Sequence, residues 1–131
     1  VGGYGFDILR LGCAGRPNKE QRALIETAME ATNSLIETLR DGRSVESAIL
    51  RLAGMRQDGI TVEPFGHGIG LEIVEVPYLL PEFKGSLKEN MILCVEPTIR
   101  KLGASASIEN EVLITRSKPE IVTKLPMELW E

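Results

Sequence analysis

Apolar residues recur every three or four positions in the first third of the chain, between residues 19 and 40. This spacing predicts a long amphipathic helix, whose apolar face is formed by Leu24, Ala28, Ala31, Leu35 and Leu39. Asn18, followed three positions later by Gln21, has the pattern of a capping box. The helix is therefore predicted to run from Lys19 to Arg40 and to be broken by Asp41-Gly42.

A second, shorter helix is predicted directly afterwards. Ser44 is a candidate N-cap, and Asp58-Gly59 is the expected end. Its apolar positions are Val45, Ala48, Ile49 and Leu52. Both helices have a charged face opposite the apolar one, which is typical of helices that pack against a sheet.

The other segments have the patterns of strands and turns. Residues 4–9 alternate between apolar and other side chains, and four further β-rich runs read GLEIVEVPYL, MILCVEPTI, SIENEVLITRS and PEIVTKL. Helices come first and most strands afterwards. This order favours an α+β fold in which a curved antiparallel sheet is backed by two helices.

Composition limits the classes of function. The chain has 131 residues, 43% of them apolar, which is the size of a single domain with a hydrophobic core. With 15 basic and 19 acidic residues, its net charge of -4 gives no basic surface for nucleic acid or a membrane. No apolar run is long enough for a membrane span, and Cys13 and Cys94 lie in apolar runs without metal-binding spacing. We therefore expect free, buried thiols in a cytoplasmic protein.

Four side chains are candidates for chemistry. His67 is the only histidine and lies among glycines, while Asp7, Glu96 and Glu109 occur in strand-like segments. On MILCVEP, the two-residue period places Glu96 on the same face as Ile92 and Cys94, where an unpaired charge is costly. Three carboxylates and one imidazole form an oxygen and nitrogen ligand set that suits Mn²⁺, Co²⁺, Fe²⁺ or Zn²⁺. Taken singly, a histidine or a Glu-Pro pair is more often structural.

Four motifs follow one another along the chain: GYGFDILR, FGHGIGLEIVEVP, MILCVEPTI and SIENEVLIT. Together they resemble the catalytic domain of the pita-bread metallopeptidases, the family of methionine aminopeptidase, prolidase, aminopeptidase P and creatinase. The resemblance runs from Gly3 to Thr115. It implies a pita-bread fold with two divalent metal ions in the complete family site. It also implies the metal ligands Asp7, His67, Glu96 and Glu109.

The chain departs from the family pattern at three places. No residue matches the family's first metal-binding aspartate, so we expect residues 1–131 to be the C-terminal portion of a pita-bread catalytic domain, inactive by itself. A family histidine seven residues after the metal-binding histidine is Val74 here, and another, four residues before it, is Glu63. Both positions are expected to line the substrate pocket, and valine cannot transfer a proton.

The resemblance implies hydrolysis by a metal-activated water, with Glu96 as the proton acceptor. One interpretation is a metal-dependent hydrolase of the Xaa-Pro peptidase type, acting on a small peptide or an amide. The alternative is a catalytically degenerate relative that uses the same fold for binding or assembly. The retained ligands favour the first interpretation, whereas Val74 and Glu63 favour the second. A homodimer is compatible with both.

Overall fold

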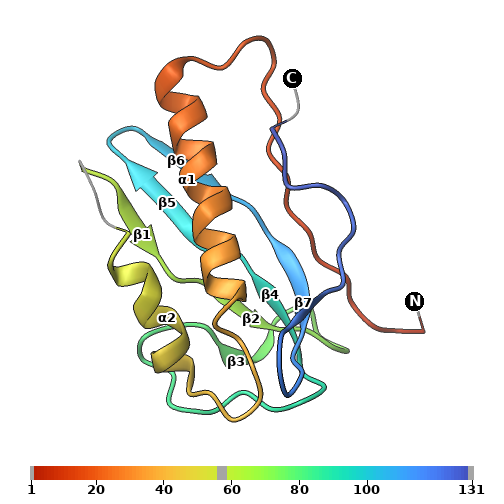
Figure 1. Ribbon diagram of the computed structural model, residues 1–131. Helices are drawn as coiled ribbons and strands as arrows, with labels where there is room; N and C mark the ends of the chain where they lie inside the picture. Colours follow the sequence, from red (N-terminus) through yellow and green to blue (C-terminus); the bar gives the residue numbers. More distant parts are fainter. Residues whose placement is uncertain (1, 56–58, 130–131) are drawn as a thin grey trace.

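Two helices lie against one face of an antiparallel β structure in the computed structural model, which describes residues 2–55 and 59–129 (Figure 1). The helices are α1 (Lys19–Ile36) and α2 (Val45–Ala53). The strands are β1 (Thr61–Glu63), β2 (Gly66–Gly68), β3 (Glu75–Tyr78), β4 (Ile92–Val95), β5 (Thr98–Lys101), β6 (Ala104–Ser107), β7 (Asn110–Leu113) and β8 (Glu120–Ile121). The predicted α+β class is confirmed.

The strands form two sheets where the sequence predicted one. A five-stranded sheet has the order β3-β2-β4-β7-β8, and a three-stranded sheet has the order β1-β5-β6. Every pairing is antiparallel, as predicted. The run MILCVEPTI, predicted as one strand, is divided at Glu96-Pro97 between β4 and β5, because proline has no N–H for a sheet hydrogen bond.

Helix α1 begins as predicted but is shorter. The side chain of Asn18 accepts from the N–H of Gln21, and the side chain of Gln21 accepts from the N–H of Asn18, so the capping box is confirmed. The helix ends at Ile36, four residues before the predicted end, because the Thr38 hydroxyl and N–H both donate to the carbonyl of Leu35 and tighten the last turn.

Helix α2 has the predicted Ser44 cap, whose side chain accepts from the N–H of Ser47. It ends at Ala53 with Gly54 as its C-cap, before the predicted stop at Asp58-Gly59. Asp58 itself lies outside the described residues.

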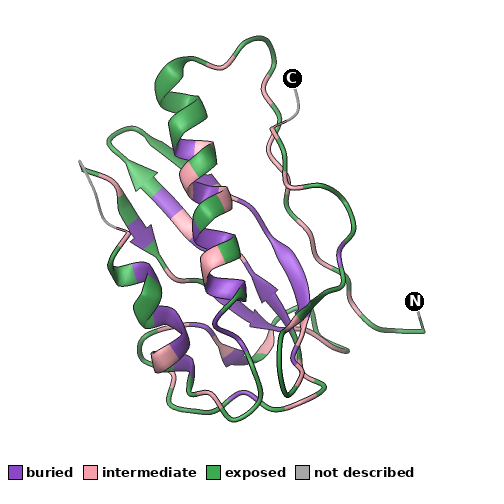
Figure 2. Ribbon diagram, viewed as in Figure 1, coloured by how far each residue is buried: buried purple, intermediate pink, exposed green. Residues whose placement is uncertain are grey.

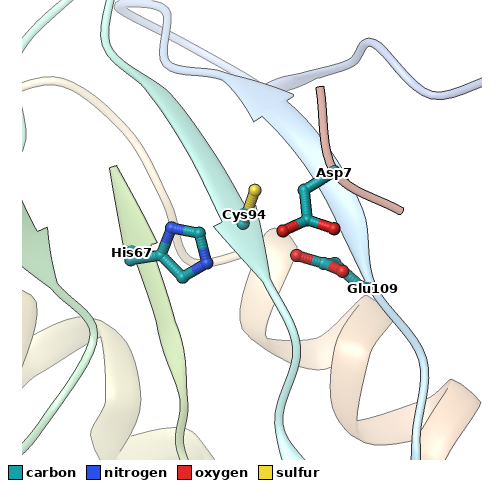
Figure 3. Close-up of side chains that lie close together, drawn as sticks. All are labelled: Asp7, His67, Cys94 and Glu109. Atoms are coloured by element: carbon teal, nitrogen blue, oxygen red, sulfur yellow. The ribbon is translucent and has the colours of Figure 1, made fainter. Parts of the chain in front are cut away.

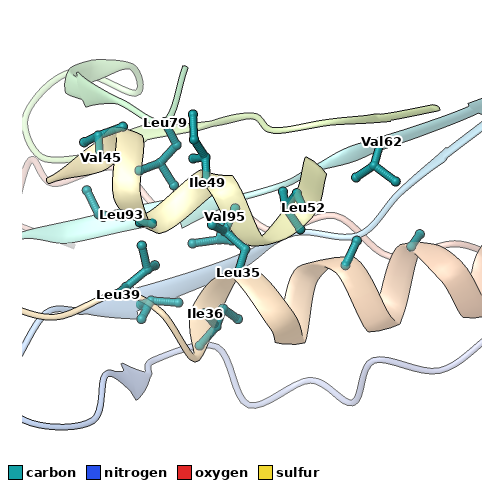
Figure 4. Close-up of a cluster of buried hydrophobic side chains, with 14 of the residues drawn as sticks. Leu35, Ile36, Leu39, Val45, Ile49, Leu52, Val62, Leu79, Leu93 and Val95 are labelled. Carbon is teal, nitrogen blue, oxygen red and sulfur yellow. The ribbon is translucent and has the colours of Figure 1, made fainter. Parts of the chain in front are cut away.

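The core forms between the helices and both sheets. Figure 2 shows buried residues where the helices face the strands. All five periodic positions of the long predicted helix are buried, and Figure 4 shows Leu35 and Leu39 in one cluster with Leu93 and Val95 of β4. Each fully buried leucine contributes about 1.5–3 kcal/mol through the hydrophobic effect. Since Leu93 and Val95 face this core, Cys94 between them points to the opposite face of the sheet.

The predicted N-terminal strand is wrong. Residues 4–11 are extended but form none of the named strands. Separate hydrogen bonds hold them: the N–H of Gly5 donates to Gly70 O over 2.8 Å, and Leu9 O accepts from the N–H of Glu109 over 3.1 Å. Tyr4 and Phe6 are exposed. The alternating pattern therefore reflects an extended segment without a continuous ladder.

The strand predicted over GLEIVEVPYL is too long. Residues 70–74 form a bend, and β3 begins only at Glu75. Val74 therefore precedes the strand in which we expected it. The sequence patterns also missed β1, β2 and most of β6, which are only three or four residues long.

Candidate metal centre

Three neighbouring strands place polar side chains in one row across the five-stranded sheet. In the register, His67 of β2 faces Cys94 of β4, and Cys94 faces Glu111 of β7. Directly paired residues on adjacent strands project to the same side of a sheet. His67, Cys94 and Glu111 therefore share the face opposite the helix-covered core.

The glycines around His67 allow β2 to lie between two close neighbours. A Cβ atom on Gly66 would lie 2.4 Å from the carbonyl oxygen of Cys94, and one on Gly68 would lie 2.5 Å from that of Val76. Both distances are too short for any side chain. The two glycines thus lie where the His67 segment passes close to neighbouring backbone, in a strand that is paired on both sides.

Two residues of this row, His67 and Cys94, lie close to Asp7 and Glu109, so that four potential ligands come together. The nearest ligand atoms of Asp7, His67, Cys94 and Glu109 all lie within 4.8 Å of one another (Figure 3). Asp7 comes from the extended N-terminal segment, and its N–H donates to Oε1 of Glu111 over 2.8 Å. Residues from four distant parts of the chain thus converge on one point.

Glu96 lies at the edge of this group. Its Oε1 is 3.4 Å from Nε2 of His67. The other ring nitrogen, Nδ1, is 2.9 Å from the carbonyl oxygen of Gly68, and it must donate because a carbonyl only accepts. In the neutral ring, the lone pair of Nε2 then faces a carboxylate, an arrangement that needs a proton or a cation between the two atoms.

The site concentrates negative charge. Burial, followed by the charges of Glu96 and Asp7, raises the pKa of Glu109 from 4.5 to about 7. Burial also raises the pKa of Glu96, where His67 opposes the shift and Asp7 adds to it. Burial is likewise the main cause of the raised pKa of Glu111. A nearby cation would reverse these penalties.

An unpaired oxygen indicates where that cation belongs. Among the described residues, Oε1 of Glu109 is buried and has no hydrogen-bond partner. Buried polar atoms are nearly always paired. The carboxylates, the free nitrogen of His67 and this oxygen together fit a divalent metal ion.

Sequence patterns missed three residues of the site. Cys94 was interpreted as an ordinary buried thiol, although the two-residue period of the strand already put it on the same face as Glu96. It is buried as predicted, whereas Cys13 is only half-buried. Glu111 follows Glu109 by two positions, the spacing of one strand face. Arg10 is the last residue of the motif GYGFDILR but was given no role: it donates to the carbonyl of Glu109 and to Oδ1 of Asn110, so it positions the start of β7.

Glu63 and Val74 stay outside this group. Glu63 belongs to β1 of the other sheet, and its exposed carboxylate pairs with Arg100 over 2.9 Å. Val74 is half exposed in the bend before β3. Their predicted place in a substrate pocket stays a prediction.

The chain is similar to known metallopeptidases in sequence and in fold. The model of metallopeptidase family M24 matches residues 1–116. The Xaa-Pro dipeptidase of Pyrococcus furiosus is 34% identical, over 96% of this chain and 38% of the dipeptidase. The methionine aminopeptidase 1D of Dictyostelium discoideum is 27% identical, over 93% of this chain and 37% of that protein. The chain thus spans well under half the length of these relatives.

Solved structures give the same result. The X-Pro aminopeptidase of Thermotoga maritima superposes with a TM-score of 0.88 at 28% identity, over 98% of this chain and 38% of that one. The prolidase of Pyrococcus furiosus superposes with a TM-score of 0.82 at 30% identity, over 95% of this chain and 38% of the prolidase. The predicted pita-bread fold is confirmed. By its sequence match over residues 1–116 and by its fold, the chain belongs to metallopeptidase family M24.

Proposed function

We propose that the chain is the C-terminal portion of a pita-bread catalytic domain in a metal-dependent hydrolase of the Xaa-Pro peptidase type. One observation carries the proposal: Asp7, His67 and Glu109 converge, with an unpaired buried oxygen on Glu109. The names of the relatives support an Xaa-Pro substrate. The part of the relatives that the chain spans, 38% in each case, supports its assignment as a portion of the domain.

The proposed ligands are Asp7, His67, Glu96 and Glu109. When bound, divalent ions such as Mn²⁺, Co²⁺, Fe²⁺ or Zn²⁺ supply a low-pKa water and a Lewis acid for the scissile carbonyl. His67 contributes Nε2, and the bond from Nδ1 to Gly68 O holds the ring in the required tautomer. Two ions in the complete site follow the family pattern and belong to the proposal.

Glu96 is the proposed proton acceptor. It is the one proposed ligand outside the tight group of Figure 3, and its side chain has 20% exposure, against 3% for His67. A carboxylate at the rim can reach both the ions and an incoming substrate. Its raised pKa brings it closer to neutral pH, which favours proton transfer.

Val74 predicts a slow enzyme. A valine cannot supply the hydrogen bond that the family histidine gives, and the loss of one transition-state donor costs on the order of 10²-fold or more in rate. We therefore expect a lower turnover than in relatives that have the histidine.

The test uses the complete natural protein, stripped with a chelator and reconstituted with each metal. We expect metal-dependent cleavage of X-Pro dipeptides or longer X-Pro peptides, and none of matched X-Ala peptides. Glu96→Gln should lose most of the rate. The control is Glu46→Gln on α2, which removes only an exposed ion pair with Lys84 and should keep the rate. Metal binding without cleavage of any peptide would favour the degenerate binding protein, and failure to bind metal would refute the proposal.

Two further features belong to the proposal. A cytoplasmic location is supported by the two free thiols, which a reducing compartment keeps unpaired, and a homodimer is proposed with it. No helix in the described part of the chain is long and apolar enough to cross a membrane.

A further inference from the structure

Cys94 occupies the middle of the candidate metal centre. Strand β4 lies between β2 and β7, and Cys94 is paired in register with His67 on one side and Glu111 on the other. Figure 3 shows its sulfur between the imidazole of His67 and the carboxylates of Asp7 and Glu109. An ion that bridges the imidazole and the carboxylates would therefore lie next to the sulfur.

Cys94 does not serve the apolar core. The neighbouring residues Leu93 and Val95 are fully buried against the helices, whereas Cys94 is fully buried on the polar face. Its surroundings there are an imidazole and carboxylates. Imidazole and carboxylate groups are metal ligands themselves, so a cation that they share can also bind the sulfur.

The distances suit coordination after a small contraction. The four ligand atoms, including Sγ of Cys94, lie within 4.8 Å of one another. Ligands at about 2.0–2.3 Å around a tetrahedral Zn²⁺ are about 3.4–3.8 Å apart, so an ion has to draw the atoms together by roughly 1 Å. Oε1 of Glu109, on a residue with 3% exposure, has no partner among the described residues and is an independent sign of a cation.

We infer that Cys94 supplies a sulfur ligand to the metal centre, so that the site prefers Zn²⁺ or Co²⁺ to Mn²⁺. This inference rests on the metal-dependent function proposed above. On binding, the S–H bond breaks, the sulfur electron pair binds the ion, and the proton passes to the buffer. Thiolate ligands select softer ions such as Zn²⁺, whereas carboxylates alone suit Mn²⁺.

A first experiment needs no variant at the site. X-ray absorption of the zinc-loaded complete protein should show a Zn–S distance of about 2.3 Å. The cobalt-loaded protein should show a near-ultraviolet sulfur-to-metal charge-transfer band. Cys13→Ser, at the second free thiol, is the matched control and should keep both signals. A bound metal with only oxygen and nitrogen neighbours would overturn the inference.

A second experiment measures selectivity. Zn²⁺ and Mn²⁺ compete for the protein and for Cys94→Ser, and circular dichroism verifies that the variant is folded. We expect the preference for Zn²⁺ over Mn²⁺ to fall at least about tenfold, since even the outer partners of metal ligands are worth about 10–100-fold in affinity. If the preference is unchanged and X-Pro cleavage is retained, the sulfur ligand is refuted but the proposed function is not. Absence of any bound metal refutes both this inference and the proposed function.

Discussion

Replacing Glu109 with glutamine should stabilise the metal-free protein at neutral and alkaline pH. Glu109 is almost completely buried, and burial and the charges of Glu96 and Asp7 raise its pKa from 4.5 to about 7. The folded protein therefore holds this proton more tightly than the unfolded chain does. Glutamine keeps the size of the side chain and removes the charge.

The sign follows from proton linkage. Between pH 4.5 and about 7, the folded state binds more protons at Glu109 than the unfolded state does, so the free energy of unfolding falls as pH rises. The stability is fully present below 4.5 and is lost by the time the pH passes about 7. At about 1.4 kcal/mol for each tenfold change in proton affinity, the loss is about 3 kcal/mol.

Urea unfolding of the metal-free protein, followed by circular dichroism from about pH 5 to about pH 8, measures this effect. Glu109→Gln should match the wild type near pH 5 and exceed it by up to about 3 kcal/mol near pH 8. Glu96 and Glu111 also have raised pKa values, so the wild type and Glu109→Gln both lose stability as the pH rises. The contribution of Glu109 is the difference between the unfolding free energies of the two proteins at each pH. Glu46→Gln, at an exposed position on α2, is the control for removing a negative charge.

Metal reverses the order of the two proteins. Saturating Zn²⁺ or Mn²⁺ should stabilise the wild type strongly and Glu109→Gln weakly, because the ion binds the folded state through this carboxylate. The reasoning is refuted if the wild type is equally stable at both ends of the pH range, or if the glutamine variant shows no gain near the upper end.

Three further predictions follow from other contacts. Gly66→Ala should destabilise the protein by about 1–3 kcal/mol or more in thermal unfolding, because the new Cβ would lie 2.4 Å from Cys94 O; Gly54→Ala, with an ordinary 3.8 Å contact, should be near neutral, and equal effects would contradict the argument. Arg10→Ala should speed amide exchange in residues 122–129, because Arg10 donates to the carbonyls of Leu125 and Pro126; unchanged exchange would contradict this role. The 131-residue chain alone should hydrolyse no X-Pro dipeptide above background, since no residue matches the family's first metal-binding aspartate; calorimetry that finds two bound ions, with turnover, would contradict this.

Local patterns located the helices well. The capping box at Asn18 and the apolar spacing after it depend only on neighbours within one or two turns, and the start of α1 is as predicted. Its end was misplaced because Thr38 makes a hydrogen bond to Leu35 O that no pattern encodes. Short strands were missed for a related reason: β2 reads GHG, and it is a strand only because β3 and β4 lie on both sides of it.

The motif order was sufficient to select Asp7, His67, Glu96 and Glu109, but not to rank them. The structure puts Cys94 into the tight group and Glu96 at its edge. That difference depends on the antiparallel register, which sets Cys94 opposite His67, and on the division of the strand at Glu96-Pro97. Register is a long-range property that alternation along one strand cannot supply.

The sequence by itself determined the two amphipathic helices, the α+β class, the family motifs and the candidate ligands, because periodicity, caps and residue chemistry are local. Tertiary structure decided which face of the sheet carries the site, which sulfur lies in it, and which oxygen is left without a partner. It also decided that residues 4–11 pass beside β7 without forming a strand and bring Asp7 to the other ligands. Those outcomes depend on contacts between segments up to about a hundred residues apart. The pattern of one segment cannot predict them, because their energies arise only when the segments pack together.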